Sequence, residues 1–236
     1  MKFSRQFTRP KKTDKKKAKP VPIKEEEESE DSEEQTNETT EEERQAAAAL
    51  VAALTGGGGD DDLRSILMYG DVNEERSAEM IVGIISLSEQ KPKEEQERLD
   101  DMKIYVSTYG GSADDMMAIY DIMRLAKNKC DIQTVGIGKV MSAGTLILAA
   151  GTKGKRKIMK NCRVMIHAVS AGSVGPIHNL QNEMEEIQAI QDAYIRCLVA
   201  ETDLTKRQLR KLLDQKVNIY LTAEEAVEYG LADEVI

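Results

Sequence analysis

The chain changes character near residue 60, and this change limits what it can fold into. Residues 1–24 carry ten Lys and Arg against one Asp, whereas residues 25–43 carry twelve Asp and Glu and neither Lys nor Arg. Three prolines and very few large apolar side chains accompany these charges. Such a composition cannot bury enough apolar surface to offset the entropy lost on ordering. We therefore expect a disordered charged tail here.

A short linker is expected between this tail and the rest of the chain. Residues 46–54 are mostly Ala and Leu, which favour a helix, and four glycines at 56–59 favour a flexible joint. The sequence thus predicts a tail, an Ala-rich helix and a Gly linker over residues 1–59, and one folded domain over 60–236. The tail is interpreted as a solvated linker, with a removable propeptide or a tether to a partner as the alternatives.

Composition excludes several classes of function. The chain has 236 residues, a net charge of −9, 40% hydrophobic residues and only 4% aromatic residues. A general nucleic-acid binder needs a basic surface, and a membrane span or secretory signal needs a long apolar run that this sequence lacks. Its three cysteines form no C-x-x-C pair. We expect no disulfide, no metal and no cofactor, and a cytoplasmic protein without nucleic-acid or membrane partners.

From residue 60 onward, short apolar segments alternate with amphipathic ones, which favours an α/β fold with a mostly parallel sheet. Strands are expected at 65–68, 102–107, 132–137, 163–167 and 218–221, and helices at 75–87, 114–127, 142–150, 179–199, 204–213 and 223–229.

Two of these helices carry apolar residues at helical spacing, which we expect to face the core. In the helix at 75–87 they are Ala78, Ile81, Val82 and Ile85. In the helix at 179–199 they are Leu180, Met184, Ile187, Tyr194 and Leu198.

Three residues of the folded part suit acyl transfer: Ser142, His167 and Asp214. A serine hydroxyl becomes a nucleophile when a base removes its proton, an imidazole can do this near neutral pH, and a carboxylate can orient that imidazole. Ser142 precedes an expected helix, so the free amides of the first helical turn could stabilise an oxyanion. Each residue alone has a simpler interpretation, namely a packed serine, a structural histidine and a surface carboxylate.

Familiar motifs of other chemistries are missing from the sequence. Gly110 and Gly111 follow an expected strand, but they form neither G-x-G-x-x-G nor a Walker sequence, so nucleotide binding is unsupported. There is no H-E-x-x-H and no cluster of metal ligands. The G-x-S-x-G elbow of α/β-hydrolases is also absent, because position 140 is Val.

Six segments in order give the chain a clear resemblance. They are 105–112 (YVSTYGGS), 118–121 (AIYD), 138–151 (GKVMSAGTLILAAG), 154–156 (GKR), 163–167 (RVMIH) and 220–231 (YLTAEEAVEYGL). Together they make residues 63–236 resemble the ClpP family, the proteolytic subunit of the Clp protease. The resemblance implies a ClpP/crotonase-like spiral of ββα units with a protruding handle helix, which is matched here by residues 179–199.

The same resemblance implies roles for individual residues. Its catalytic serine, histidine and aspartate correspond to Ser142, His167 and Asp214. The remaining implied positions are oxyanion-hole amides at Gly111 and Ala143, and substrate-strand binding at Gly110, Val169, Ala171 and Gly172. Where the family usually has Pro before the double glycine and Met after the serine, this chain has Tyr109 and Ala143.

The resemblance also implies partners. They are further copies of the chain in a ring, expected as a heptamer that pairs into a double ring, together with an AAA+ Clp unfoldase and protein or peptide substrates. Three alternatives remain open: a phage-type head-maturation protease of the same fold, a non-catalytic ring subunit, and an acyl-CoA enzyme of the related crotonase branch.

Overall fold

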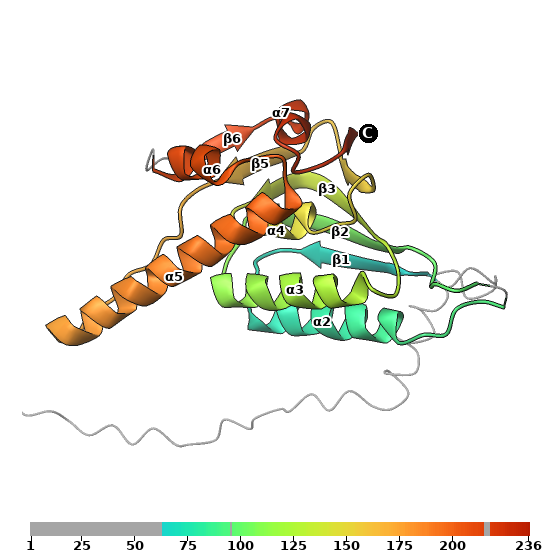
Figure 1. Ribbon diagram of the computed structural model, residues 1–236, viewed down its shortest axis with the longest axis horizontal. Coiled ribbons are helices and arrows are strands. Elements are labelled where there is room, and N and C mark those ends of the chain that lie inside the picture. The colour runs from blue at the N-terminus through green and yellow to red at the C-terminus, as the bar shows by residue number, and fades with distance from the viewer. Residues whose placement is uncertain (1–62, 95, 215–217) are drawn as a thin grey trace, which may run out of the picture. The chain divides into compact units, whose positions relative to one another are not determined.

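A computed structural model describes residues 63–94, 96–214 and 218–236 (Figure 1). The tail, helix and Gly linker expected over residues 1–59 lie outside these described residues, so that prediction stays a prediction.

Parallel strands make up most of the sheet, which confirms the expected α/β class (Figure 1). Its main path is β1 (Ser65–Tyr69), β2 (Met102–Thr108), β3 (Ile132–Met141), β4 (Arg156–Ile158) and β7 (Glu234–Val235). Off this path, β5 (Arg163–Ile166) pairs in parallel with β3, and β6 (Ile219–Leu221) pairs antiparallel with β5. Strands β4 and β7 were not expected, since segments of three and two residues are too short to show alternation.

Strand β3 is longer than expected because it changes partners along its length. Its first half pairs with β2 and β4, and its last three residues pair with β5 in place of β4, while Val140 stays paired with Thr108 of β2. Gly138 lies between the two halves with φ 64°, a left-handed conformation that glycine adopts without steric cost. This bend directs the end of β3 toward the end of β5.

The helices begin close to their expected positions. They are α2 (Glu74–Ser88), α3 (Ala113–Ala126), α4 (Ala143–Ala149), α5 (Ile177–Glu201), α6 (Lys206–Leu213) and α7 (Ala223–Glu228). At α2, α3, α6 and α7 the residue before the helix accepts a backbone hydrogen bond from the first turn, as Asn, Ser and Thr commonly do.

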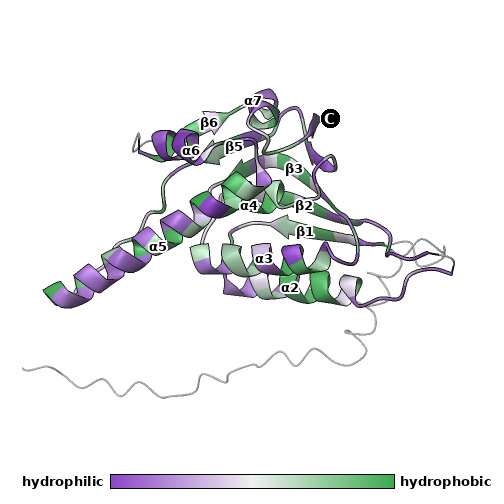
Figure 2. Ribbon diagram, viewed as in Figure 1, coloured by the Kyte–Doolittle hydropathy of each residue, from purple (hydrophilic) through white to green (hydrophobic). Residues whose placement is uncertain are grey.

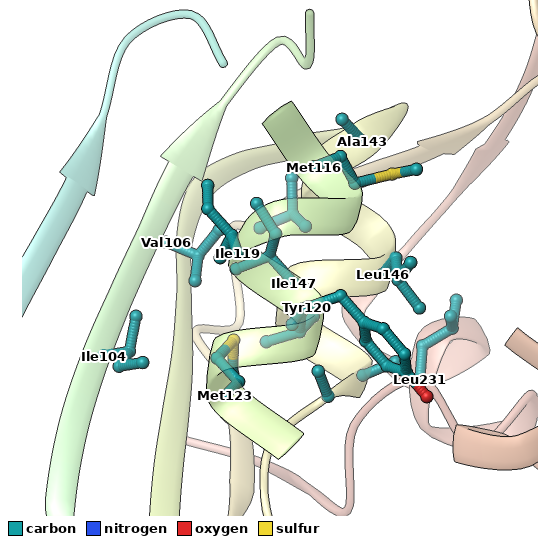
Figure 3. Packing of buried hydrophobic residues seen from close by; sticks show 14 of the residues in the cluster. Ile104, Val106, Met116, Ile119, Tyr120, Met123, Ala143, Leu146, Ile147 and Leu231 are labelled. Carbon is teal, nitrogen blue, oxygen red and sulfur yellow. The ribbon is translucent and has the colours of Figure 1, made fainter. Parts of the chain in front are cut away.

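The core lies between the sheet and helices α3 and α4 (Figure 3). Every residue of α4 is buried, including the polar Thr145, and the other residues of the helix are small or apolar. Labelled members of the cluster come from β2, α3, α4 and the segment after α7: Ile104, Val106, Met116, Ile119, Tyr120, Met123, Ala143, Leu146, Ile147 and Leu231.

The expected core face of α2 is wrong in part. The helix buries Met80 and Ile84, whereas Val82 is 63% exposed and Ile85 is 41% exposed. Contacts of α2 with α3 and β1 decide which side faces inward, and they leave part of its broad apolar stripe uncovered.

Helix α5 is buried only at its C-terminal base. Tyr194 and Leu198 pack into the core as expected, but Met184 is 66% exposed. The helix extends away from the sheet, and its far half mixes hydrophilic and hydrophobic residues (Figure 1, Figure 2). Its inner half therefore belongs to the core, and its outer half has no cover within the described chain.

A buried arginine holds together segments that are far apart in the sequence. Arg156 is 3% exposed and donates hydrogen bonds to the Asp233 carboxylate and to the carbonyls of Glu201 (2.6 Å) and Gly230 (2.8 Å). Burial raises the pKa of Asp233, but the hydrogen bonds and charge of Arg156 outweigh it and hold that pKa below its usual value. The pair ties β4 to the C-terminal end of α5 and to the segment before β7.

Replacing Asp233 with Asn tests this arrangement. We expect the free energy of unfolding to fall by about 2–3 kcal/mol, because a buried arginine loses its counter-charge. Denaturant titration measures the change. The matched control is Glu234→Gln, which breaks the neighbouring and more exposed pair with Lys157 (3.5 Å) and should change stability by less than about 0.5 kcal/mol. Equal effects of the two substitutions would contradict the role given to Arg156.

Candidate active site

Ser142 and His167 lie together because two paired strands end side by side. Met141 of β3 is in register with Met165 of β5, and each candidate residue follows shortly after its strand. The Ser142 amide donates to the Met165 carbonyl (2.8 Å), and His167 Nε2 lies 2.7 Å from Ser142 Oγ. The structure thus places the expected nucleophile and base within one hydrogen bond of each other.

The backbone of Ser142 is bent sharply. Its φ of 53° and ψ of −121° are rare for a residue with a side chain and cost about 1–3 kcal/mol, which the surroundings must offset. Gly110 makes room for the bend, since a Cβ there would lie 2.5 Å from Ser142 Cβ. Gly110 was expected to bind the substrate strand, and the structure shows that it also gives the nucleophile its space.

His167 is half-buried, and burial lowers its pKa below the ordinary value of 6.5. A lowered pKa keeps the ring neutral near pH 7. A neutral ring with its hydrogen on Nδ1 leaves Nε2 free to accept the Ser142 proton. The described contacts therefore suit His167 as a general base.

A cavity of about 170 Å³ opens beside the two residues. It is lined by Gly111, Ser112, Ala113, Met116, Ser142, Ala143, His167, Ala168, Val169, Ser170 and Tyr194. Among the described contacts, the amides of Gly111 and Ala143 donate no hydrogen bond within the protein. Both expected oxyanion-hole donors therefore border the cavity with amides free to bind an oxygen.

Asp214 lies next to this site without a bond to the histidine. It is exposed at the C-terminal end of α6, and it lines a second cavity of about 580 Å³ together with Ala168 and Val169. No hydrogen bond joins Asp214 to His167 in the described part of the chain. The expected role of Asp214 stays a prediction, and residues 215–217, which follow it, lie outside the described residues.

The segment after His167 is not a strand in the isolated chain. Its Val169 amide donates to Gln191 Oε1 of α5 (2.6 Å), and Ala171 and Gly172 are exposed. An exposed segment that pairs with no strand of the described chain suits the expected addition of a substrate strand. The binding role of Val169, Ala171 and Gly172 stays a prediction.

Two residues at the site were not identified from the sequence. Tyr194 was expected only as a core residue, yet it lines the active-site cavity. Thr145 lies behind Ser142 and bonds to Tyr194. No local motif distinguishes either residue, since their roles arise from the packing of α5 against α4.

Among the residues that the structure describes, no group of three or more His, Cys, Asp or Glu side chains could hold a metal ion. No helix in that part of the chain is long and apolar enough to cross a membrane.

The sheet with its protruding helix and the Ser–His pair beside free amides define a serine hydrolase of α/β fold. Residues 61–236 match the family described as Clp protease, and the chain belongs to that family. It is 34% identical over 172 residues to the ATP-dependent Clp protease proteolytic subunit of Deinococcus radiodurans, covering 72% of this chain and 79% of the relative. It is 37% identical over 178 residues to proteolytic subunit 1 of Corynebacterium jeikeium, covering 73% and 87%. The chain is a ClpP-type serine endopeptidase, as the resemblance implied.

The environment of His167 predicts the pH dependence of hydrolysis. Because a lowered pKa keeps the base form present in more acidic solution, the acid limb of kcat/KM should lie below pH 6.5. Peptide hydrolysis measured from about pH 5 to 8 locates the limb. A limb at or above 6.5 would contradict this and would show that a negative charge stabilises the protonated ring.

Proposed function

We propose that Ser142, His167 and Asp214 hydrolyse peptide bonds as a catalytic triad. Ser142 Oγ attacks the peptide carbonyl carbon while His167 Nε2 takes the hydroxyl proton. The carbonyl oxygen becomes an oxyanion, which the amides of Gly111 and Ala143 stabilise. The oxyanion then collapses, the C–N bond breaks, and His167 returns the proton to the leaving amine.

Water completes the cycle. His167 removes a proton from a water molecule, whose oxygen attacks the acyl-enzyme carbonyl. The second tetrahedral intermediate collapses, the acid product leaves, and Ser142 Oγ regains its proton from His167. Asp214 accepts a hydrogen bond from His167 Nδ1 during turnover, which holds the ring in the tautomer whose Nε2 can take the proton and stabilises the imidazolium that forms. This bond requires the end of α6 to approach His167.

The observation that carries this proposal is the 2.7 Å separation between Ser142 Oγ and His167 Nε2, beside a cavity bordered by two free amides. The substrate is an extended peptide that adds a strand between Gly110 and the segment containing Val169, Ala171 and Gly172.

We further propose that the enzyme acts as a ring of identical subunits, with seven copies in each ring and two rings stacked. Two uncovered surfaces support assembly: Leu67 and Tyr69 are exposed on β1, and Met184 is exposed on α5. Apolar side chains of this size on a strand and on a projecting helix are typical of surfaces that partners cover.

The names of the relatives include "ATP-dependent", and we propose that an AAA+ unfoldase feeds substrates to this chain as well. A cytoplasmic location fits the three free cysteines, which are typical of reducing compartments. We propose the tail and linker of residues 1–59 as a segment separate from the catalytic domain of residues 60–236.

Labelling with a serine-reactive phosphonate tests the triad. Wild-type protein should be labelled at Ser142, and Ser142→Ala should not be labelled at all. Asp214→Asn should lower kcat by about 10³–10⁴-fold, because the ring is no longer held in the reactive tautomer.

Asp192→Asn is the matched control for Asp214. Asp192 lines the same second cavity but pairs with Arg210 (3.1 Å), so its replacement should leave kcat within about twofold. Labelling of Ser142→Ala at the wild-type rate would overturn the assignment of Ser142 as the nucleophile. Full activity of Asp214→Asn would contradict the assignment of Asp214 to the triad.

Assembly is tested on helix α5. Met184→Asp places a charge on its uncovered half, and we expect native mass spectrometry to show smaller species than wild type, because burying an unpaired charge at an interface is costly. Glu185→Gln, one residue along, should leave the assembly mass unchanged. A wild-type protein that is monomeric at micromolar concentration would contradict the ring.

A further inference from the structure

The peptide bond between Ser142 and Ala143 joins two parts of the site. Its N–H belongs to Ala143, the proposed oxyanion donor, and its C=O belongs to Ser142. A trans peptide is planar, with the C=O and N–H pointing in opposite directions. Whatever holds the Ser142 carbonyl therefore also sets the direction of the Ala143 N–H.

Two hydroxyl groups restrain that carbonyl in addition to the ordinary bond of the first helical turn, one directly and the other through the first. The Ser142 oxygen accepts from the Thr145 amide (2.9 Å) and from Thr145 Oγ1 (2.6 Å), and Tyr194 Oη lies 3.5 Å from the same oxygen. Thr145 Oγ1 and Tyr194 Oη lie 2.7 Å apart. Because the single hydroxyl hydrogen of Thr145 points to Ser142, Tyr194 donates to Thr145.

Both hydroxyls are shielded from water. Thr145 is 0% exposed and Tyr194 is 3% exposed, so their hydrogen bonds have few competitors. Burial raises the pKa of Tyr194 to about 12, and the hydroxyl therefore stays protonated and able to donate near neutral pH. Tyr194 lies in the buried C-terminal part of α5, so packing of that helix holds the tyrosine in place.

We infer that Thr145 and Tyr194 are positioning residues that aim the Ala143 amide into the oxyanion hole. This inference rests on the proposed function, in which that amide stabilises the tetrahedral oxyanion. The Thr145 amide makes the ordinary bond of the first helical turn, so the two hydroxyls add restraint at a peptide whose direction matters for catalysis. The two hydroxyls should stabilise the transition state and not the bound substrate, because the oxyanion develops only as the reaction proceeds.

Steady-state kinetics with Tyr194→Phe and Thr145→Val tests the inference on the full-length assembled protein. Each substitution removes one hydroxyl and keeps the shape of the side chain. We expect kcat and the rate of phosphonate labelling to fall together, by about tenfold for each variant, while KM changes less than about twofold. Thr145→Ser keeps the hydroxyl and should restore kcat to near the wild-type value. The double variant should lose less than the product of the two single losses, because both act through one carbonyl.

Tyr120→Phe is the matched control, since Tyr120 is a buried tyrosine whose hydroxyl bonds to Glu201 (3.0 Å) and which does not line the active-site cavity. It should keep the wild-type kcat. Wild-type kcat in both Tyr194→Phe and Thr145→Val would overturn the inference, as would an equal loss in Tyr120→Phe. If Tyr194→Phe fails to assemble, the comparison of Thr145→Val with Thr145→Ser decides the matter. Failure of the proposed function is distinct, because wild-type protein would then go unlabelled.

Discussion

Ser142 leaves β3 with a positive φ, and the surrounding segments supply the bonds and the space that this bend requires. The Ser142 amide is held by the Met165 carbonyl of β5, and its carbonyl is held by Thr145 of α4. Gly110, after β2, leaves room because it has no Cβ. Strain of this kind persists only where the fold determines it from several sides. The conformation of Ser142 therefore depends on the pairing of β3 with β5.

The change of partner along β3 explains how the fold meets that requirement. Without this change the end of β3 would continue beside β4 and would not pair with the strand that leads to His167. The turn at Gly138 lets the last residues of β3 pair with β5, so that the strands leading to Ser142 and His167 end together.

The sequence predicted features with local causes better than features set by packing. Alternating apolar residues located β2, because one face of that strand is more buried than the other, and a run of small and apolar residues located α4, which is buried on all sides. The inward face of α2 was wrong in part, because contacts with other elements choose among several apolar stripes. The role of the Tyr194 hydroxyl could not be predicted for a similar reason, because the position of Tyr194 in the helical pattern indicates only that the residue is buried.

Helix α5 connects the uncovered part of the domain with the buried site. A helix gains most of its stability from packing, and the outer half of α5 has no such packing within the described chain. The inner half carries Tyr194, whose Oη lies near the Ser142 carbonyl, and Gln191, whose side-chain oxygen accepts a hydrogen bond from the Val169 amide. A partner that covers the outer half would hold the whole helix more firmly, since an α-helix transmits restraint along its hydrogen-bonded axis. The two parts of the site that contact α5, at Ser142 and at Val169, would then be most ordered in the assembled enzyme.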